Sequence, residues 1–185
     1  MALVGSAGLT IGLAFQGSLS NFAGGILILI LKPFVVGDYV SVCGCEGTVA
    51  VISLFYTTLH TVDNRNVVLP NGSLSNSNIT NYSANEIRRV DMSVDVGYGS
   101  DLKKAREVIM DILNQDERIL KDPAPIVAVD NLGDSGVNVL IRPWVKCEDY
   151  WAVKWSVLEA VHNRLNAEQI DIPFPQMTVH LDQNS

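Results

Sequence analysis

The chain has 185 residues, with 13 Lys and Arg against 20 Asp and Glu, so its formal net charge is −7. This acidic balance argues against nucleic-acid binding, because phosphate contacts need clustered basic side chains. Its three cysteines, an odd number, do not form a complete disulfide framework, which fits a reducing compartment.

The first segment, residues 1–31, carries no charged side chain, whereas about 20 apolar residues suffice to cross a bilayer. A secretory signal would place basic residues before a short apolar run, yet the first basic residue is Lys32. A wholly buried helix of a soluble protein is the other alternative. We therefore predict that residues 1–31 are embedded in a membrane.

Helical spacing of about 100° per residue sorts the start of this segment into separate faces. Two faces carry only small residues: Gly5, Gly8 and Gly12 on one side, and Ala7 and Ala14 on nearly the opposite side. Small residues let helices approach closely in lipid, so two such faces predict head-to-tail contacts that close into a ring. Ordinary packing against other helices of the same chain is the alternative.

In such a ring, the flank between the two small-residue faces points at the axis. It carries Leu9 and Leu13, one turn apart, with Ser6 before them and Gln16 after them. Narrow rings of Leu can gate a passage by dewetting. The sequence therefore predicts a constriction at Leu9 and Leu13, with Ser6 and Gln16 lining the passage.

A straight helix of this length would measure about 46 Å, more than the ~30 Å of a hydrocarbon core. Gly17, which a serine follows, is the predicted kink, because Gly/Ser pairs are recurrent kink sites. Gly25, the second of two adjacent glycines, is a second predicted hinge. The part beyond Gly17 is then expected to lie along the membrane interface. Lys32 and Pro33 end the helix.

Residues 33–84 form the expected middle domain, in which short β-branched runs alternate with turn residues. The predicted strands are 39–42, 48–54, 57–62, 67–69 and 79–82. About five short strands indicate a small, five-stranded barrel-like domain of the Sm or SH3 type. Its only nearby basic residues are Lys32 and Arg65, which argues against RNA binding.

Residues 85–172, with a last strand in 173–185, show the order strand, helix, strand, strand, helix, strand of a ferredoxin-like α/β domain. The predicted strands are 90–96, 125–131, 137–145 and 177–181. The predicted helices are 102–113, which begins after Ser100 and Asp101, and 151–165, which carries the apolar stripe Trp151, Trp155, Leu158, Val161 and Leu165.

The sequence offers little for catalysis, so we expect no enzyme, no catalytic residue, no metal and no cofactor. The three histidines, His60, His162 and His180, sit beside no acid–nucleophile spacing. Cys43-x-Cys45 in a turn would need Cys147 and a histidine to hold zinc, and the usual zinc signature has two cysteine pairs. The three tryptophans are expected in the core or in subunit contacts.

Seven motifs, in order and at matching spacing, carry a resemblance over residues 3–182. They are GLAFQGSLSNFAGGILI at 12–28, KPFVVGDYV at 32–40, EGTV at 46–49, VLPNG at 68–72, ITNYS at 79–83, DERILKDP at 116–123 and PFPQMTVHL at 173–181. With these motifs the chain resembles the small-conductance mechanosensitive channels of bacteria, the MscS family. The resemblance implies a homoheptamer in the inner (plasma) membrane, multi-pass in the full-length protein, with the bulk of this chain in the cytoplasm.

The resemblance also implies roles for parts of the chain. The pore helix kinks at Gly17, rings of Leu9 and Leu13 form the apolar constriction, and the two downstream domains build a hollow vestibule. The last strand, near 177–181, joins a barrel shared by the subunits. The implied function is a channel that membrane tension opens to release ions and small solutes during hypoosmotic shock, with membrane lipids as further partners and no nucleic acid.

The family has two further transmembrane helices before the pore helix, which provide most of the tension-sensing surface, whereas this sequence begins at the pore helix. The resemblance therefore does not imply that these 185 residues gate under tension by themselves. The alternative is a non-conducting cytoplasmic cage or assembly module. Leu13→Ser distinguishes the two, because only a channel with a Leu gate becomes leaky.

Overall fold

The computed structural model describes residues 2–179, and the side chains of residues 2–5 and 7 are left out of the description. Predicted positions Gly5 and Ala7 therefore lie outside the described side chains, and Leu181 lies outside the described chain. The structure divides into two compact units, residues 1–85 and 86–185, which we describe separately.

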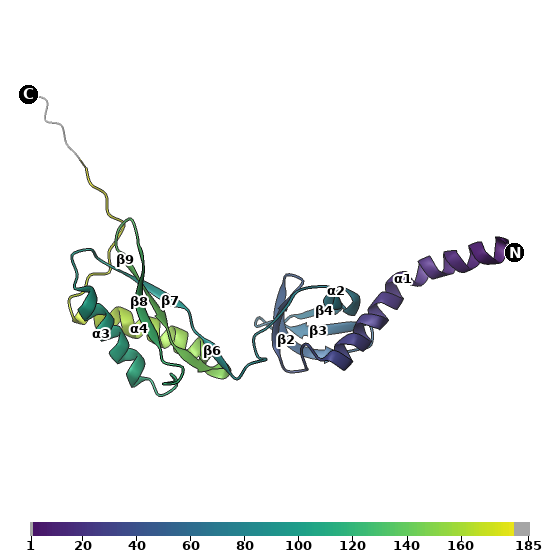
Figure 1. The fold of residues 1–185 in the computed structure, drawn as a ribbon, viewed down its shortest axis with the longest axis horizontal. Helices are drawn as coiled ribbons and strands as arrows, with labels where there is room; N and C mark the ends of the chain where they lie inside the picture. Colours follow the sequence, from purple (N-terminus) through teal and green to yellow (C-terminus); the bar gives the residue numbers. More distant parts are fainter. Residues whose placement is uncertain (1, 180–185) are drawn as a thin grey trace, which may run out of the picture. The chain divides into compact units, whose positions relative to one another are not determined.

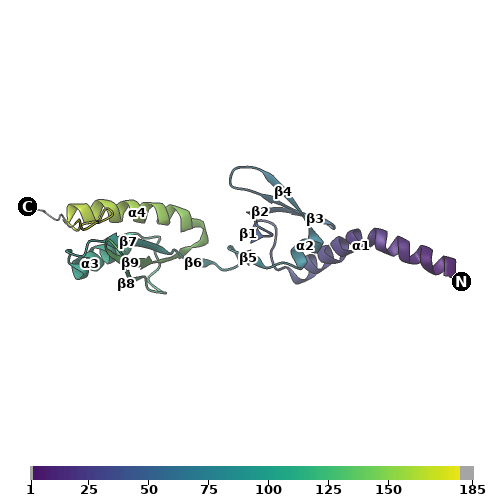
Figure 2. The same ribbon diagram turned by 90° about the horizontal axis from the view of Figure 1, so that it is seen from above.

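The first unit begins with one long helix, α1 (Ala2–Leu31), whose hydrogen-bonded helix is unbroken. Figures 1 and 2 show that the axis of α1 changes direction partway along its length. After α1 come the strands β1 (Tyr39–Val42), β2 (Cys45–Ile52), β3 (Tyr56–His60), β4 (Asn66–Pro70) and β5 (Ile79–Asn81), with the short helix α2 (Asn71–Ser75) between β4 and β5.

The five strands form one antiparallel sheet in the order β4-β3-β2-β1-β5. Alternate residues of β1 and β3 are buried, as expected of strands that cover a core with one face. The core also receives Ile28 from α1 and Leu74 from α2. Helix α2 was not predicted. The sequence pattern indicated a turn at residues 71–72, whereas these two residues are the first two of α2.

The second unit contains two small antiparallel sheets and two long helices. Its elements are β6 (Ile87–Arg89), β7 (Met92–Val96), α3 (Leu102–Gln115), β8 (Ile126–Leu132), β9 (Val137–Arg142), β10 (Trp144–Lys146), the 3-10 turn η1 (Cys147–Asp149) and α4 (Tyr150–Ala167). The sheets have the orders β7-β9-β8 and β10-β6. Pro143 separates β9 from β10, because proline lacks the N–H that a continuous ladder would use.

Helix α3 begins as its sequence indicates, since the Asp101 side chain accepts hydrogen bonds from the backbone N–H groups of Lys103 (2.9 Å) and Lys104 (3.1 Å). Helix α4 forms where it is predicted, but its buried face differs from the predicted apolar stripe. Its buried face consists of Val153, Val157, Val161 and Leu165, whereas Trp151 and Trp155 are exposed. Apolar residues occur on several sides of α4, so spacing alone did not identify the face that packs.

The predicted last strand, residues 177–181, runs beyond the described chain, and its place in a barrel shared by the subunits stays a prediction. Residues 173–179 form no strand, and the sheet of the second unit accordingly has three strands, not the four of a complete ferredoxin-like pattern. Phe174 and Met177 are more than 80% exposed. A strand needs the N–H and C=O groups of a neighbour, and in this single chain no neighbouring strand pairs with 173–179.

Candidate functional site

Helix α1 is long and apolar enough to cross a membrane. The candidate span is Gly8–Leu31, with a mean hydropathy of 1.6, and only 17% of its most apolar window is buried within the chain. A core helix of a soluble protein would be mostly buried, so this low burial argues against that alternative. The 30 residues of α1 span about 45 Å at 1.5 Å per residue, which exceeds a ~30 Å hydrocarbon core.

The residues predicted to face a pore all lie on the exposed part of α1. Leu9 and Leu13 are 67% and 62% exposed, and Ser6 and Gln16 are exposed as well. The bulky flank is equally open, since Ile11 is 59% exposed. In a single chain both flanks are exposed, and the assignment of Leu9 and Leu13 to a constriction stays a prediction.

The small residues of α1 fall into two groups: those in its N-terminal half are exposed, and Gly24 and Gly25 lie against other parts of the first unit. A methyl group added at Gly8, Gly12 or Gly17 would meet no atom within 4 Å, and Ala14 is exposed. Gly8, Gly12 and Ala14 are open to a neighbouring helix, as the ring prediction requires, and none of the described residues fills these positions. The kink predicted at Gly17 stays a prediction too, although α1 does bend (Figures 1 and 2).

Gly25, in contrast, lies where α1 closely contacts the turn between β2 and β3 and the start of α2. An added Cβ would press against the carbonyl oxygen of Leu54 and lie 2.7 Å from Nδ2 of Asn71. At Gly24 it would lie 2.5 Å from the backbone oxygen of Asn71. Only glycine permits this approach of two backbones. The structure thus gives Gly25 a packing contact, and its predicted hinge role remains a prediction.

Asn71 holds this junction together from inside the protein. Its fully buried side chain accepts a hydrogen bond from Thr57 Oγ1 (2.8 Å) and donates one to the carbonyl oxygen of Ser53 (2.8 Å). Its backbone N–H donates to the carbonyl oxygen of Phe55 (2.9 Å). These bonds fix the turn between β2 and β3 against the start of α2, which is the surface that α1 covers.

Two contacts connect α1 directly to this surface. The backbone N–H of Gly72 donates to Oδ1 of Asn21 (3.0 Å), and the rings of Phe22 and Phe55 lie 6.0 Å apart. The sequence analysis did not identify Asn21, Asn71 or Thr57. The Gly-Gly pair inside an apolar helix was the available signal, because such a pair marks close backbone approach, but it did not reveal the partner.

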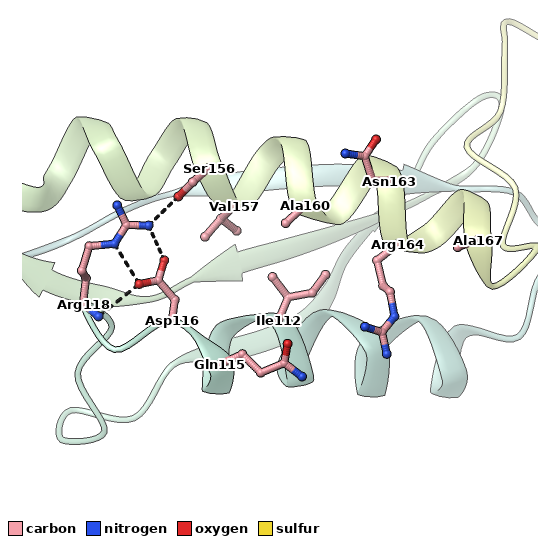
Figure 3. A pocket seen from close by; sticks show the side chains of 10 residues that line it. All are labelled: Ile112, Gln115, Asp116, Arg118, Ser156, Val157, Ala160, Asn163, Arg164 and Ala167. Atoms are coloured by element: carbon pink, nitrogen blue, oxygen red, sulfur yellow. Dashed lines mark hydrogen bonds and ion pairs between the residues drawn. The ribbon is translucent and has the colours of Figure 1, made fainter.

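The second unit has a groove of about 440 Å³ between α3 and α4. Figure 3 shows the two helices side by side, with Arg118 bonded to the carboxylate of Asp116 and to the hydroxyl of Ser156. The Arg118 hydrogen bonds hold the pKa of Asp116 below its ordinary value. The floor is made of Ile112, Val157 and Ala160. Asp116 and Arg118 pair with each other, Arg164 pairs with Glu168, and the residues that line the groove offer no nucleophile with a base.

The described residues, 2–179, were also compared with the requirements of a metal site and of a reactive thiol. Within them, no group of three or more His, Cys, Asp and Glu residues is placed to hold a metal ion. Cys147, which a zinc site would have needed beside Cys43 and Cys45, belongs to the other unit. Burial raises the pKa of the Cys147 thiol, opposed in part by the charge of Arg88.

Comparison with known proteins gives matches over both units. Residues 17–84 match the family model described as mechanosensitive ion channel, beta-domain, and residues 90–172 match the model described as mechanosensitive ion channel MscS, C-terminal. An uncharacterised MscS family protein of Synechocystis is 44% identical over 183 residues, 99% of this chain and 62% of that protein.

Two named channels are also similar to this chain. The small-conductance mechanosensitive channel of Edwardsiella ictaluri is 42% identical over 178 residues, 96% of this chain and 62% of that protein. The crystal structure of Helicobacter pylori MscS in the closed state superimposes with a TM-score of 0.93 at 36% identity, covering 99% of this chain and 73% of that one. The chain therefore spans 62% of the length of the first two relatives.

Proposed function

The chain belongs to the MscS family of mechanosensitive channels, and on this premise we propose that it forms the pore helix and cytoplasmic part of an ion channel subunit. Membrane tension opens the channel to release ions and small solutes during hypoosmotic shock. Rings of Leu9 and Leu13 form its apolar gate, and Ser6 and Gln16 line the passage on either side.

The observation that carries this proposal is that one half of α1 packs against the rest of the first unit and the other half is exposed. Its C-terminal half is docked on α2 and the turn between β2 and β3 through Asn21, Gly24 and Gly25, whereas its N-terminal half is uncharged, mostly apolar and exposed. An apolar helix needs lipid or other copies around it. In a ring of copies within the membrane, the two small-residue faces of each helix contact the neighbouring helices, and the bulky flank contacts lipid.

We further propose a homoheptamer in a bacterial inner membrane, multi-pass in the full-length protein, with most of this chain in the cytoplasm. The domains are residues 1–32 (a pore helix that kinks at Gly17), 33–84 (a small β domain), 85–172 (a ferredoxin-like α/β domain) and 173–185. In the ring, segment 173–185 supplies one strand of a barrel shared by the subunits. That role explains why apolar Met177 and Val179 are exposed in a single chain.

Native mass spectrometry of the chain in mild detergent tests the assembly. The expected dominant species has seven times the 20.1 kDa mass of one chain. A monomer or dimer as the main species would contradict assembly of a ring by these residues.

A pair of substitutions tests the gate. The protein, expressed from its whole reading frame in bacteria that lack other mechanosensitive channels, is compared with Leu13→Ser and with the matched control Ile11→Ser on the opposite flank of α1. A polar ring wets a Leu constriction, so Leu13→Ser is expected to leak, to open at lower tension in patch recordings and to slow growth. Ile11→Ser should not leak. A silent Leu13→Ser refutes the gate and favours the non-conducting cage.

A further inference from the structure

The sequence contains a single Asn-Gly dipeptide, Asn71-Gly72, which forms the start of α2. Asparagine is a chemically labile residue. It deamidates most readily before glycine, because glycine has no side chain to shield the backbone nitrogen that attacks the asparagine amide. The groups that surround these two residues therefore decide whether the dipeptide is chemically stable in the folded protein.

Deamidation has two steps and uses only the chain and water. The backbone nitrogen of Gly72 loses its proton and forms a bond to Cγ of Asn71, the Cγ–Nδ2 bond breaks, and ammonia leaves. The resulting succinimide ring then takes up one water molecule and opens to aspartate, or to isoaspartate, whose peptide bond runs through the side chain. The first step requires a free Gly72 nitrogen and an Asn71 side chain that is able to turn toward it.

Helix α1 occupies the attacking nitrogen. The N–H of Gly72 donates a hydrogen bond to Oδ1 of Asn21 (3.0 Å). A Cβ at Gly24 would lie 2.8 Å from the same nitrogen, so the backbone of α1 lies directly against it. Gly24 and Gly72 are both buried. The nitrogen is therefore hydrogen-bonded and covered as long as α1 is docked.

The amide that would be attacked is held by the β-domain. Oδ1 of Asn71 accepts from Thr57 Oγ1 and its Nδ2 donates to the carbonyl oxygen of Ser53, both at 2.8 Å. The side chain is fully buried, so water does not reach it. Rotation of Cγ toward Gly72 would break both hydrogen bonds inside the protein, which is costly.

Packing nevertheless requires this labile dipeptide. A Cβ at position 72 would lie 2.8 Å from Oγ of Ser20 and 2.9 Å from Oδ1 of Asn21, so glycine is needed for α1 to dock. Asn71 is needed because its amide accepts one hydrogen bond and donates another, whereas an aspartate carboxylate only accepts. The contact that imposes the Asn-Gly pair is thus the contact that protects it.

We propose that Asn71 is a site of spontaneous deamidation and that docking of α1 controls the rate. When α1 leaves the junction, Gly72 loses both its hydrogen-bond acceptor and its cover, and the reaction proceeds from this open form. The product disfavours redocking, because a carboxylate at position 71 places a charged oxygen beside the carbonyl oxygen of Ser53 in a buried site. Deamidation therefore makes undocking permanent, since a chemical change in the open form is not reversed on closing.

Peptide mapping by mass spectrometry measures this reaction in the purified protein, kept in mild detergent at mildly alkaline pH, where the glycine N–H loses its proton more readily. Gly25→Ala and Asn21→Ala each weaken the docking contact. The matched controls Gly17→Ala and Ser18→Ala make the same exchanges at exposed positions of α1. The parent chain unfolded in urea gives the rate of the unprotected dipeptide.

The folded parent protein is expected to deamidate at Asn71 slower than the unfolded chain by about tenfold or more. The rate follows the population of the open form, so Gly25→Ala and Asn21→Ala should react about fivefold faster than the parent protein or more, and the controls within about twofold of it. Hydroxylamine, which cleaves chains at Asn-Gly succinimides, should split the variants between residues 71 and 72 in the same order of rates.

Three results would overturn the proposal. One is equal deamidation of the folded parent protein and the unfolded chain. Another is equal rates in the docking variants and their controls. The third is equal acceleration at Asn76, an exposed asparagine at the end of α2, which would show melting of α2 and not undocking of α1. Circular dichroism checks that each variant is folded, and none of these results bears on whether the protein conducts ions.

Discussion

Substitution of Gly25 by alanine tests whether close backbone approach docks α1 on α2 and the turn between β2 and β3. The added methyl group would press against the carbonyl oxygen of Leu54 and lie 2.7 Å from Nδ2 of Asn71. The Leu54 atom belongs to the backbone and Asn71 is held by its hydrogen bonds to Thr57 and Ser53, so neither yields easily. Overpacking of this kind costs about 1–3 kcal/mol.

Gly17→Ala is the matched control, because it is the same substitution in the same helix where an added Cβ meets nothing within 4 Å. Alanine favours helix over glycine by about 1 kcal/mol at either position. That gain applies whether or not α1 is docked, so it does not affect docking. The docking equilibrium therefore reports the clash at Gly25 alone.

Hydrogen exchange measures this equilibrium at the backbone N–H groups of Asn71 and Gly72, which donate to Phe55 and Asn21. A docking loss of 1–3 kcal/mol corresponds to about 5- to 150-fold faster exchange in Gly25→Ala. Gly17→Ala should leave these rates unchanged. Unchanged rates in Gly25→Ala, or equal acceleration in both variants, would refute the proposed role of the contact.

Other substitutions test the buried and exposed polar groups. Thr57→Val should cost about 1–3 kcal/mol in urea unfolding, since it removes the hydrogen bond to the buried Oδ1 of Asn71, and Thr57→Ser should restore most of it. The pKa of Asp116 lies below its ordinary 3.8 because of Arg118, so their pair stabilises the fold above about pH 4 and loses this effect as pH falls through the lower, folded-state pKa. Asp116→Asn should therefore be less stable than the parent protein at pH 7, and the difference should shrink as the pH falls below about 4, as followed by tryptophan fluorescence; a difference that stays constant with pH would contradict the coupling. Cys43→Gly should raise stability by about 1 kcal/mol in thermal unfolding by relieving the positive φ of +51°, and a fall in stability would show that the turn is not strained.

Features set by neighbouring residues were predictable from the sequence. The charge-free run of residues 1–31 indicated a long apolar helix, and α1 ends at Leu31, just before Lys32. Alternation of apolar and polar residues located β1 at residues 39–42, and Asp101 marked the start of α3. These signals are local because helix caps and strand faces depend on residues only a few positions apart.

The tertiary structure decided everything that depends on which surfaces meet. Asn71 appeared to be a turn residue, yet it is the buried centre of the junction between α1 and the sheet, because 46 residues after Gly25 the chain returns to it. The buried face of α4 was likewise decided by packing, with Val157 turned inward and Trp155 outward. Residues 173–179 stayed without a strand, although their apolar alternation favours one, because a strand forms only where a partner supplies its hydrogen bonds. Sequence periodicity identifies a surface that needs covering, and only the fold, or a second chain, determines what covers it.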